Sequence, residues 1–188
     1  MPSNTLNGKK IAVLATDGFE QSELRVPVDE LRGAGAEVHV IAPKEGSIRG
    51  WDHDKWGTAV PVDRVVRDAD ASQYDALVLP GGVMNPDQLR QDKDAIAFTR
   101  AFFKAGKPVS AICHGPQVLI NCGVLEGRHV TSYPSIRVDL ENAGAHWTDE
   151  EVVCDEGLTT SRTPDDLPAF VSKTIEEIAE GRHAGQRA

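Results

Sequence analysis

The chain has 188 residues, 40% of them hydrophobic, which is enough for one domain with a buried core and argues against disorder. Its net charge of -9 comes with scattered lysines and arginines rather than a basic cluster, so nucleic acid is not an expected partner. No apolar run reaches the ~18 residues of a membrane span, so no membrane contact is expected.

The first ten residues are polar and lack the layout of a secretory signal, so we expect a cytoplasmic protein. The three cysteines form no C-x-x-C pair and show no zinc-site spacing, which predicts free thiols. The histidines do not gather into a metal site either, since residues 52–54 have no second cluster to complete a coordination sphere. No nucleotide-binding glycine motif follows a strand, so we expect no cofactor and no metal.

Apolar runs alternate with amphipathic segments along the chain. The segment 44–73 is glycine-rich and predicts an irregular loop with short edge strands near residues 60–66. The other predicted elements are, in order, a strand at 10–15, a helix around 24–33, strands at 37–42 and 75–79, a helix ending at 106, strands at 108–112 and 130–133, a helix at 134–143, a strand at 151–154 and a helix from 164 to about 180.

Several of these strands are apolar on both faces, and helical segments separate them. This pattern is typical of an α/β fold, in which helices cover both faces of a mostly parallel sheet. No internal repeat or linker divides the chain, so residues 1–188 are predicted to form a single domain with a core at about 9–180.

Cys113 follows an apolar strand, and Gly115-Pro116 opens a new helix two residues later. Proline is well suited to the first helical turn, so Cys113 is predicted at a sharp strand-to-helix turn, like the nucleophile elbow of other α/β enzymes. A helix N-terminus lowers a thiol pKa, which favours a reactive thiolate. The alternative is a small buried hydrophobe, which is how we interpret Cys122 and Cys154.

Five segments together resemble the ThiJ/PfpI superfamily, and its PfpI-like intracellular peptidase branch in particular. The resemblance implies a flavodoxin-like three-layer sandwich of the class I glutamine amidotransferase type, and a homodimer or larger assembly. The late His-x-Glu of glutamine amidotransferases is absent, so that activity is not expected. The segments are residues 16–20, 75–82, 111–117, 131–134 and 161–167, in matching order over about residues 9–180.

The resemblance also implies roles for individual residues. Cys113 corresponds to the nucleophile, and His114 corresponds to its base. Glu20 corresponds to an acidic residue that contacts the sulfur, and a carboxyl beside a thiolate is expected to hold a proton. The alternatives are that Glu20 caps the following helix and that His114 only fills the turn.

The glycines after the strand at 75–79 are candidates for the oxyanion hole. Gly82 corresponds to an amide donor whose partner is the N–H of His114, and Gly81 shares the turn. In the peptidase branch a glutamate from a neighbouring subunit orients the histidine, and here the matching position carries Asp87. An N-terminal helix cap explains Asp87 equally well.

The implied function is a stress-associated cysteine hydrolase that acts as a peptidase, a protein deglycase or a glyoxalase. Each activity begins with thiolate attack on a carbonyl, and the substrate would be a peptide, a glycated protein or a small aldehyde. A small pocket would favour aldehydes and an open groove would favour peptides. The alternative is a non-catalytic redox sensor or chaperone that uses an oxidisable Cys113.

Overall fold

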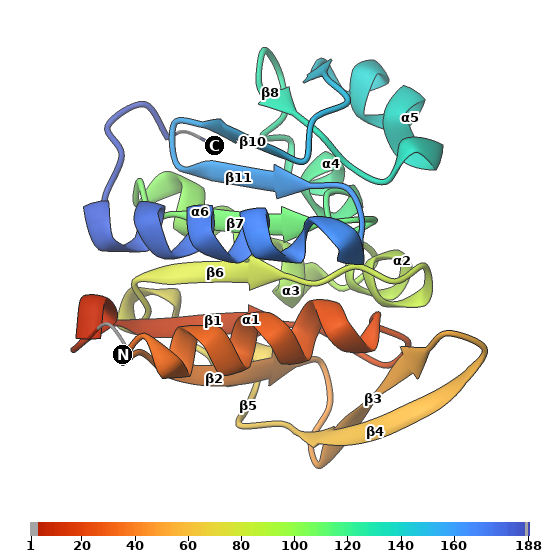
Figure 1. Cartoon of the computed structure of the whole chain (residues 1–188), viewed down its shortest axis with the longest axis vertical. Helices are drawn as coiled ribbons and strands as arrows, with labels where there is room; N and C mark the ends of the chain where they lie inside the picture. Colours follow the sequence, from red (N-terminus) through yellow and green to blue (C-terminus); the bar gives the residue numbers. More distant parts are fainter. Residues whose placement is uncertain (1–3, 187) are drawn as a thin grey trace.

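A seven-stranded sheet lies between two layers of helices in the computed structural model, which describes residues 4–186 and 188 (Figure 1). The strand order is β10-β11-β7-β6-β1-β2-β5, and all neighbours are parallel except β10 and β11. The strands are β1 (Lys10–Leu14), β2 (Glu37–Ala42), β5 (Arg64–Val65), β6 (Ala76–Leu79), β7 (Val109–Ile112), β10 (Val152–Asp155) and β11 (Leu158–Ser161). The predicted α/β class is confirmed.

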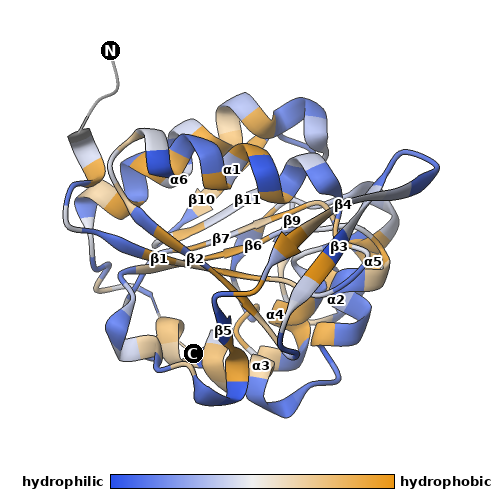
Figure 2. Ribbon diagram, turned by 90° about the horizontal axis from the view of Figure 1, so that it is seen from below, coloured by the Kyte–Doolittle hydropathy of each residue, from blue (hydrophilic) through white to orange (hydrophobic). Residues whose placement is uncertain are grey.

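The two helical layers cover opposite faces of the sheet (Figure 2). Helices α1 and α6 pack together on one face, whereas α2, α3 and α4 lie on the other. The helices are α1 (Gln21–Gly33), α2 (Met84–Leu89), α3 (Lys93–Lys104), α4 (Gln117–Cys122), α5 (Arg137–Asn142) and α6 (Leu167–Glu180), with short 3-10 helices at Asn4–Leu6, Val66–Asp68, Ala71–Gln73, Pro134–Ile136 and Pro164–Asp166.

Alternation along each strand supplies a core to both faces. In β1, Ile11 and Val13 belong to the core under α1 and α6, whereas Ala12 and Leu14 belong to the core under α3 and α4. All four side chains are fully buried. Side chains of neighbouring residues in a strand point to opposite faces, so a strand buried on both sides must be apolar throughout.

The helical periodicity read from the sequence matches the buried faces. In α1, Leu24, Val28 and Leu31 are buried, and burial of each large apolar side chain contributes about 1.5–3 kcal/mol. Helix α3 begins at a strong cap, because one oxygen of Asp92 accepts from the amides of residues 94 and 95, at 2.9 Å each. These local signals fix where the helices begin and which face they bury.

Part of the segment 44–73 differs from the predicted irregular loop. Residues Ser47–Asp52 (β3) and Lys55–Pro61 (β4) form an antiparallel hairpin that extends beyond the main sheet (Figure 1). Trp51 pairs with Trp56 across it, with ring centroids 5.4 Å apart in an edge-to-face arrangement. The hairpin could not be predicted from the sequence pattern, because the segment contains several glycines and its strands are stabilised by cross-strand pairs rather than by a buried apolar run.

Smaller differences occur in the C-terminal third. The strand predicted at 130–133 is reduced to β8 (His129–Val130), which pairs with β9 (His146–Trp147). Cys154 is exposed on β10, so the packing role predicted for it is wrong, whereas Cys122 is buried. None of the described helices combines the length and the apolar character that a membrane crossing requires.

The topology brings three turns to one edge of the sheet. Strands β1, β6 and β7 are parallel neighbours, so their carboxyl ends lie side by side and lead into residues 15–20, 80–83 and 113–116. In α/β proteins this edge is where ligands bind.

Candidate active site

Cys113 lies where β7 ends, and its backbone is in the left-handed region with φ 62°. A non-glycine residue pays conformational energy there, of order 1–3 kcal/mol, so the surroundings must hold it in place. The Cys113 amide donates to the carbonyl of Ser161 at 3.0 Å, and its own carbonyl accepts from the amide of Tyr133 at 2.9 Å. The sharp turn predicted from the sequence is therefore present, clamped on both sides by the backbone.

Two backbone amides and one imidazole surround the Cys113 sulfur. The amides of Gly82 and His114 hydrogen-bond to it, and Nδ1 of His114 lies 3.2 Å from Sγ. Gly82 has φ 79°, and a Cβ at this position would lie 2.5 Å from the carbonyl oxygen of Gly18. Only glycine fits at this position, so the turn can bring the amide of Gly82 close to the sulfur of Cys113.

Gly81 is not positioned as the oxyanion-hole donor that was predicted. Its amide donates to Oε2 of Glu23 at 2.9 Å, so it is not free to bind an oxyanion. A Cβ on Gly81 would lie 2.7 Å from Cβ of Cys113 and 2.5 Å from that same carboxylate oxygen. Gly81 thus holds the acid and leaves room for the thiol, and the candidate oxyanion donors are reduced to Gly82 and His114.

The carboxyl next to the thiol belongs to Glu23. Its side chain is fully buried in the first turn of α1 and shares a hydrogen bond with the side chain of Cys113. Burial, reinforced by the negative charge of nearby Glu20, raises the pKa of Glu23 from 4.5 to about 8. At neutral pH this acid therefore holds its proton.

The thiol and this acid are electrostatically coupled. Burial raises the pKa of Cys113, and a negative charge on Glu23 raises it further. Helix α4 has only six residues, and the lowered thiol pKa predicted from its N-terminus gives way to desolvation. With Glu23 protonated the repulsion disappears, and the amides of Gly82 and His114 oppose part of the desolvation by lowering the pKa of the thiol.

Glu20 does not make the contact that was predicted for it. It caps α1, where its Oε2 accepts from the amide of Glu23 at 2.8 Å and from the hydroxyl of Ser22 at 2.5 Å. This is the alternative considered for Glu20 above, and the position against the thiol belongs to Glu23, three residues later. A sequence signal existed, because Glu23 lies on the buried face of α1 with Leu24 and Pro27.

His114 is held by two residues of a distant segment. Its Nε2 lies 3.1 Å from Oγ of Ser135, and its ring stacks on that of Tyr133 with centroids 4.8 Å apart. Burial lowers the pKa of His114, so the ring is neutral at pH 7. If Nδ1 accepts the thiol proton, Nε2 must carry the hydrogen and donate it to Ser135. Sequence reasoning missed Ser135 because no motif links it to His114.

Asn85 is a further residue that the sequence did not reveal. Its side chain is fully buried, its Oδ1 accepts from the amide of Thr16 at 2.8 Å, and its Nδ2 donates to the carbonyls of Pro80 and Gly81. It therefore ties the turn after β1 to the turn after β6, which carries Gly82, one of the two proposed oxyanion donors.

Asp87 is exposed in the first turn of α2 and does not line the cavity at Cys113. Within one chain, the contact at Nε2 of His114 is made by Ser135 instead. A carboxylate reaching His114 from a second chain therefore remains a prediction.

The thiol opens into a cavity of about 600 Å³. Its lining includes Trp51 and His53 of the β3–β4 hairpin, together with Met84, Tyr133 and Pro164. A neighbouring cavity of about 540 Å³ shares four wall residues with it. These four are Glu20, Trp51, His53 and Pro164. The two cavities therefore adjoin and continue past the hairpin toward α1.

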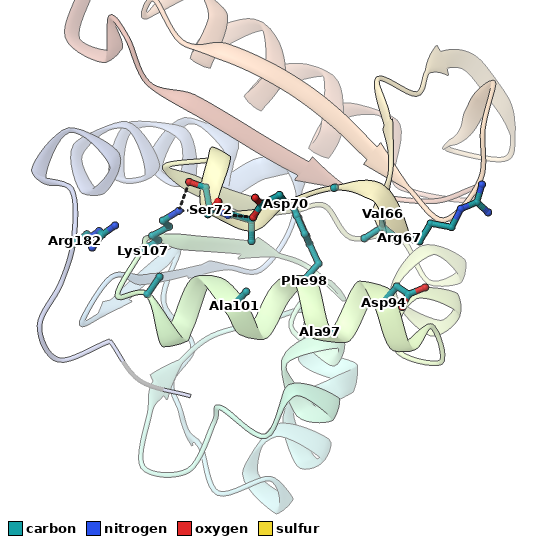
Figure 3. A pocket seen from close by; sticks show the side chains of 13 residues that line it. Val66, Arg67, Asp70, Ser72, Asp94, Ala97, Phe98, Ala101, Lys107 and Arg182 are labelled. Atoms are coloured by element: carbon teal, nitrogen blue, oxygen red, sulfur yellow. Dashed lines mark hydrogen bonds between the residues drawn. The ribbon is translucent and has the colours of Figure 1, made fainter.

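Another cavity, of about 500 Å³, lies away from the thiol between α3 and the segment 66–72 (Figure 3). Lys107 is buried beside it, and burial lowers the pKa of this lysine. Its ammonium donates to the carbonyls of Ala71, Ser72 and Tyr74, so all three of its donors are used. Lys107 thus anchors the loop and is not positioned as a nucleophile.

Fold and site define a class of protein: a flavodoxin-like α/β sandwich with a cysteine on a strained strand-to-helix turn, beside a histidine and a buried protonated acid. Residues 9–177 match the DJ-1/PfpI family, and the chain belongs to that family. The superfamily resemblance seen in the sequence is thereby confirmed.

Similar proteins extend over nearly the whole chain. General stress protein 18 of Bacillus subtilis is 53% identical over 171 residues, which cover 89% of this chain and 96% of the relative. Protein/nucleic acid deglycase 2 of Escherichia coli is 50% identical and covers 86% of this chain and 93% of the relative. A two-domain Anabaena variabilis protein with DJ-1/ThiJ/PfpI-like and ferritin-like domains superposes with a TM-score of 0.86 at 35% identity, covering 96% of this chain and 50% of that one.

Proposed function

We propose that this PfpI-type cysteine hydrolase acts as a stress-associated deglycase, which removes carbonyl adducts such as those of methylglyoxal from amino groups. The main support is the position of Cys113, whose sulfur lies 3.2 Å from a neutral imidazole nitrogen and against the protonated carboxyl of Glu23. A nucleophile, a base and an acid thus lie close enough together to act on the same carbonyl group.

The proposed reaction begins when the Cys113 thiol transfers its proton to Nδ1 of His114. The sulfur attacks the adduct carbon that bears the amino group, so a C–S bond forms while the C–N bond breaks, and the amine leaves with the proton from His114. His114 then removes the proton from that carbon, and the amides of Gly82 and His114 would stabilise the resulting enediolate oxyanion while Glu23 would donate a proton. Protonation of the neighbouring carbon leaves a lactate thioester of Cys113, and water cleaves its C–S bond, so the adduct and one water molecule become the free amine and one molecule of lactic acid.

Protein-borne adducts are the substrates that the cavities favour. The cavity at Cys113 adjoins a second one along the hairpin, and this second cavity leaves room for the polypeptide of a protein substrate on one side of its modified residue. A free aldehyde of three carbons would fill little of 600 Å³. The name of the Escherichia coli relative also includes nucleic acid, so an adduct on a nucleobase is the second substrate to test, although the chain has net charge -9.

The assembly we propose is a homodimer in the cytoplasm. Val83 and Tyr133 are exposed apolar residues at the mouth of the cavity, and Met84 lies beside them. A second chain covering this mouth would bury them and could bring its Asp87 near His114. The free cysteines agree with a reducing compartment.

The test compares four substrates with the same enzyme: a peptide carrying a methylglyoxal adduct, the unmodified peptide, a glycated nucleotide and free methylglyoxal. We expect lactate and free amine from the glycated peptide, no release in Cys113→Ser, and little amide-bond cleavage. Faster turnover of free methylglyoxal than of the glycated peptide would instead support a glyoxalase. Cleavage of the unmodified peptide would support a peptidase.

The redox-sensor alternative uses the same thiol but does not need a base. His114→Ala separates the two functions, because it should abolish lactate release while leaving oxidation of Cys113 by peroxide intact. If neither wild-type protein nor variant turns over any of the four substrates while Cys113 oxidises readily, the deglycase proposal is wrong.

A further inference from the structure

Two carboxylates and one imidazole converge at the C-terminal end of α6, far from Cys113 in the sequence. One ligand-type atom from each of Glu177, Glu180 and His183 lies within 4.8 Å of the other two. Sequence reasoning did not find this grouping, because the histidine follows the helix and the turn at Gly181 brings it back toward the two glutamates. Imidazole nitrogen with carboxylate oxygen is a donor set that suits Zn²⁺ and related ions.

The two most buried donors lie at a distance that a shared metal ion can bridge. Nε2 of His183 lies 3.2 Å from Oε2 of Glu177. That nitrogen is buried, yet it has no partner in hydrogen-bond geometry within residues 4–186 and 188. Two ligands at ~2.0–2.1 Å from a tetrahedral zinc ion lie about 3.4 Å from each other.

The histidine ring is held in place before any ligand binds. The amide of His183 donates to the carbonyl of Gly106 at 2.8 Å. On the other side the ring packs so closely on Gly157 that a Cβ there would lie 2.7 Å from Cδ2. A ligand that is already oriented loses little freedom on binding a metal ion.

Charge also favours a cation at this position. Glu176, Glu177 and Glu180 lie at the C-terminal end of α6, where the helix dipole is negative, and the last turn contains no basic residue. Lys173 compensates part of this charge through Oε1 of Glu177 and through Glu176, at 2.9 Å each. Oε2 of Glu177 faces Nε2 of His183, and Glu177 also accepts a hydrogen bond from Cys154, whereas Glu180 makes no ion pair with any of the described residues.

We propose that Glu177, Glu180 and His183 form a binding site for one divalent transition-metal ion of the Zn²⁺ type, which fastens the segment after Gly181 to the end of α6. Three protein ligands leave the fourth tetrahedral position to water. Mg²⁺ and Ca²⁺ prefer sites made entirely of oxygen ligands and should not compete. The site lies outside the proposed catalytic cavity, so the ion would stabilise the fold without entering the reaction.

The test is a Zn²⁺ titration of the full-length, chelator-treated protein by calorimetry, with Co²⁺ absorption as a spectroscopic probe of tetrahedral coordination. We expect one ion per chain and no effect of excess Mg²⁺. His183→Ala should weaken binding by more than about 100-fold, because changes in residues that merely support a ligand already cost about 10–100-fold. His129→Ala, which removes an exposed histidine elsewhere, is the matched control and should bind normally.

Two further variants keep the result interpretable. Glu180→Gln alters an exposed side chain, so it should weaken binding without disturbing the fold, and it should leave turnover by Cys113 unchanged. Cys113→Ser removes a thiol that could itself bind zinc beside His114, and it should retain the site at α6. Absence of binding at millimolar metal would overturn the proposal, as would binding that is lost in Cys113→Ser but kept in His183→Ala.

Discussion

Glu23→Gln replaces a buried acid by a neutral side chain of the same shape. The glutamine oxygen can still accept from the amide of Gly81, as Oε2 of Glu23 does at 2.9 Å. In the wild-type protein, unfolding returns the pKa of Glu23 from about 8 to its usual 4.5. Between these two pH values the folded chain holds a proton that the unfolded chain releases.

The sign of the effect follows from this difference in bound protons. Because the folded state binds more protons, the free energy of unfolding of the wild-type protein decreases as pH rises from 4.5 to about 8 and then levels off. One pH unit corresponds to about 1.36 kcal/mol, so this single group removes roughly 5 kcal/mol across the range. Glu23→Gln has no such proton, so its free energy of unfolding minus that of the wild-type protein should increase by that amount as pH rises over this range.

Urea denaturation at several pH values between 4.5 and 8.5 measures this difference. Both proteins are compared in the Cys113→Ser background, so that the neighbouring thiol does not titrate. Glu150→Gln, which removes an exposed carboxylate, is the control and should show no growing advantage. A difference between Glu23→Gln and wild type that stays constant with pH would refute the assignment of a raised pKa to Glu23.

The same substitution should affect turnover in the opposite direction. A glutamine cannot donate a proton to the oxyanion, so Glu23→Gln with Cys113 intact should lose about 10²–10⁴-fold in kcat, the usual contribution of a general acid. Wild-type activity should also fall above pH ~8, where Glu23 loses its proton. An activity that stays level through pH 9 would contradict the role of acid.

The remaining predictions concern the groups around the thiol. Ser135→Ala should lower kcat by about tenfold, because the tautomer of His114 loses the hydrogen bond that supports it, and it should change the free energy of unfolding by only about 0.5–1.5 kcal/mol. An unchanged pH–rate profile would refute a role of Ser135 in holding His114. Gly82→Ala should unfold at lower urea concentration and lose turnover, because its Cβ would meet the carbonyl of Gly18 at 2.5 Å; equal stability would contradict the close packing. Asp87→Ala should reduce the His114-dependent rate only if the chain is dimeric, so kcat is measured together with oligomeric state, and an unchanged rate in a dimer would remove the proposed intersubunit contact.

The sheet and the elbow were predictable because their signals are local. Apolar runs separated by amphipathic segments indicate buried parallel strands, and the strands β1, β6 and β7 lie within a residue of the predicted positions. The sequence around Cys113 contains the whole turn in seven residues, so its position at the end of a strand needed no tertiary information. The β3–β4 hairpin was not predictable in this way, because cross-strand contacts such as Trp51 with Trp56 stabilise it.

The identity of the carboxyl beside the thiol shows where local reasoning fails. Glu20 and Glu23 are separated by three residues, and either could follow β1 toward the site. The structure uses Glu20 as the N-cap and turns Glu23 inward, because capping fixes the start of α1 and hence which face of the helix is buried. A shift of the helix start by one residue would have changed the outcome.

By itself, the sequence determined the α/β class and the cysteine at a strand-to-helix turn, since both depend on neighbouring residues and their periodicity, and five segments in matching order showed the resemblance to the family. The tertiary structure alone decided that Ser135 contacts His114, that Glu23 is the buried acid beside the thiol, and that His183 meets Glu177. Such contacts join segments through packing, and the pKa of a group depends on how far burial removes it from water.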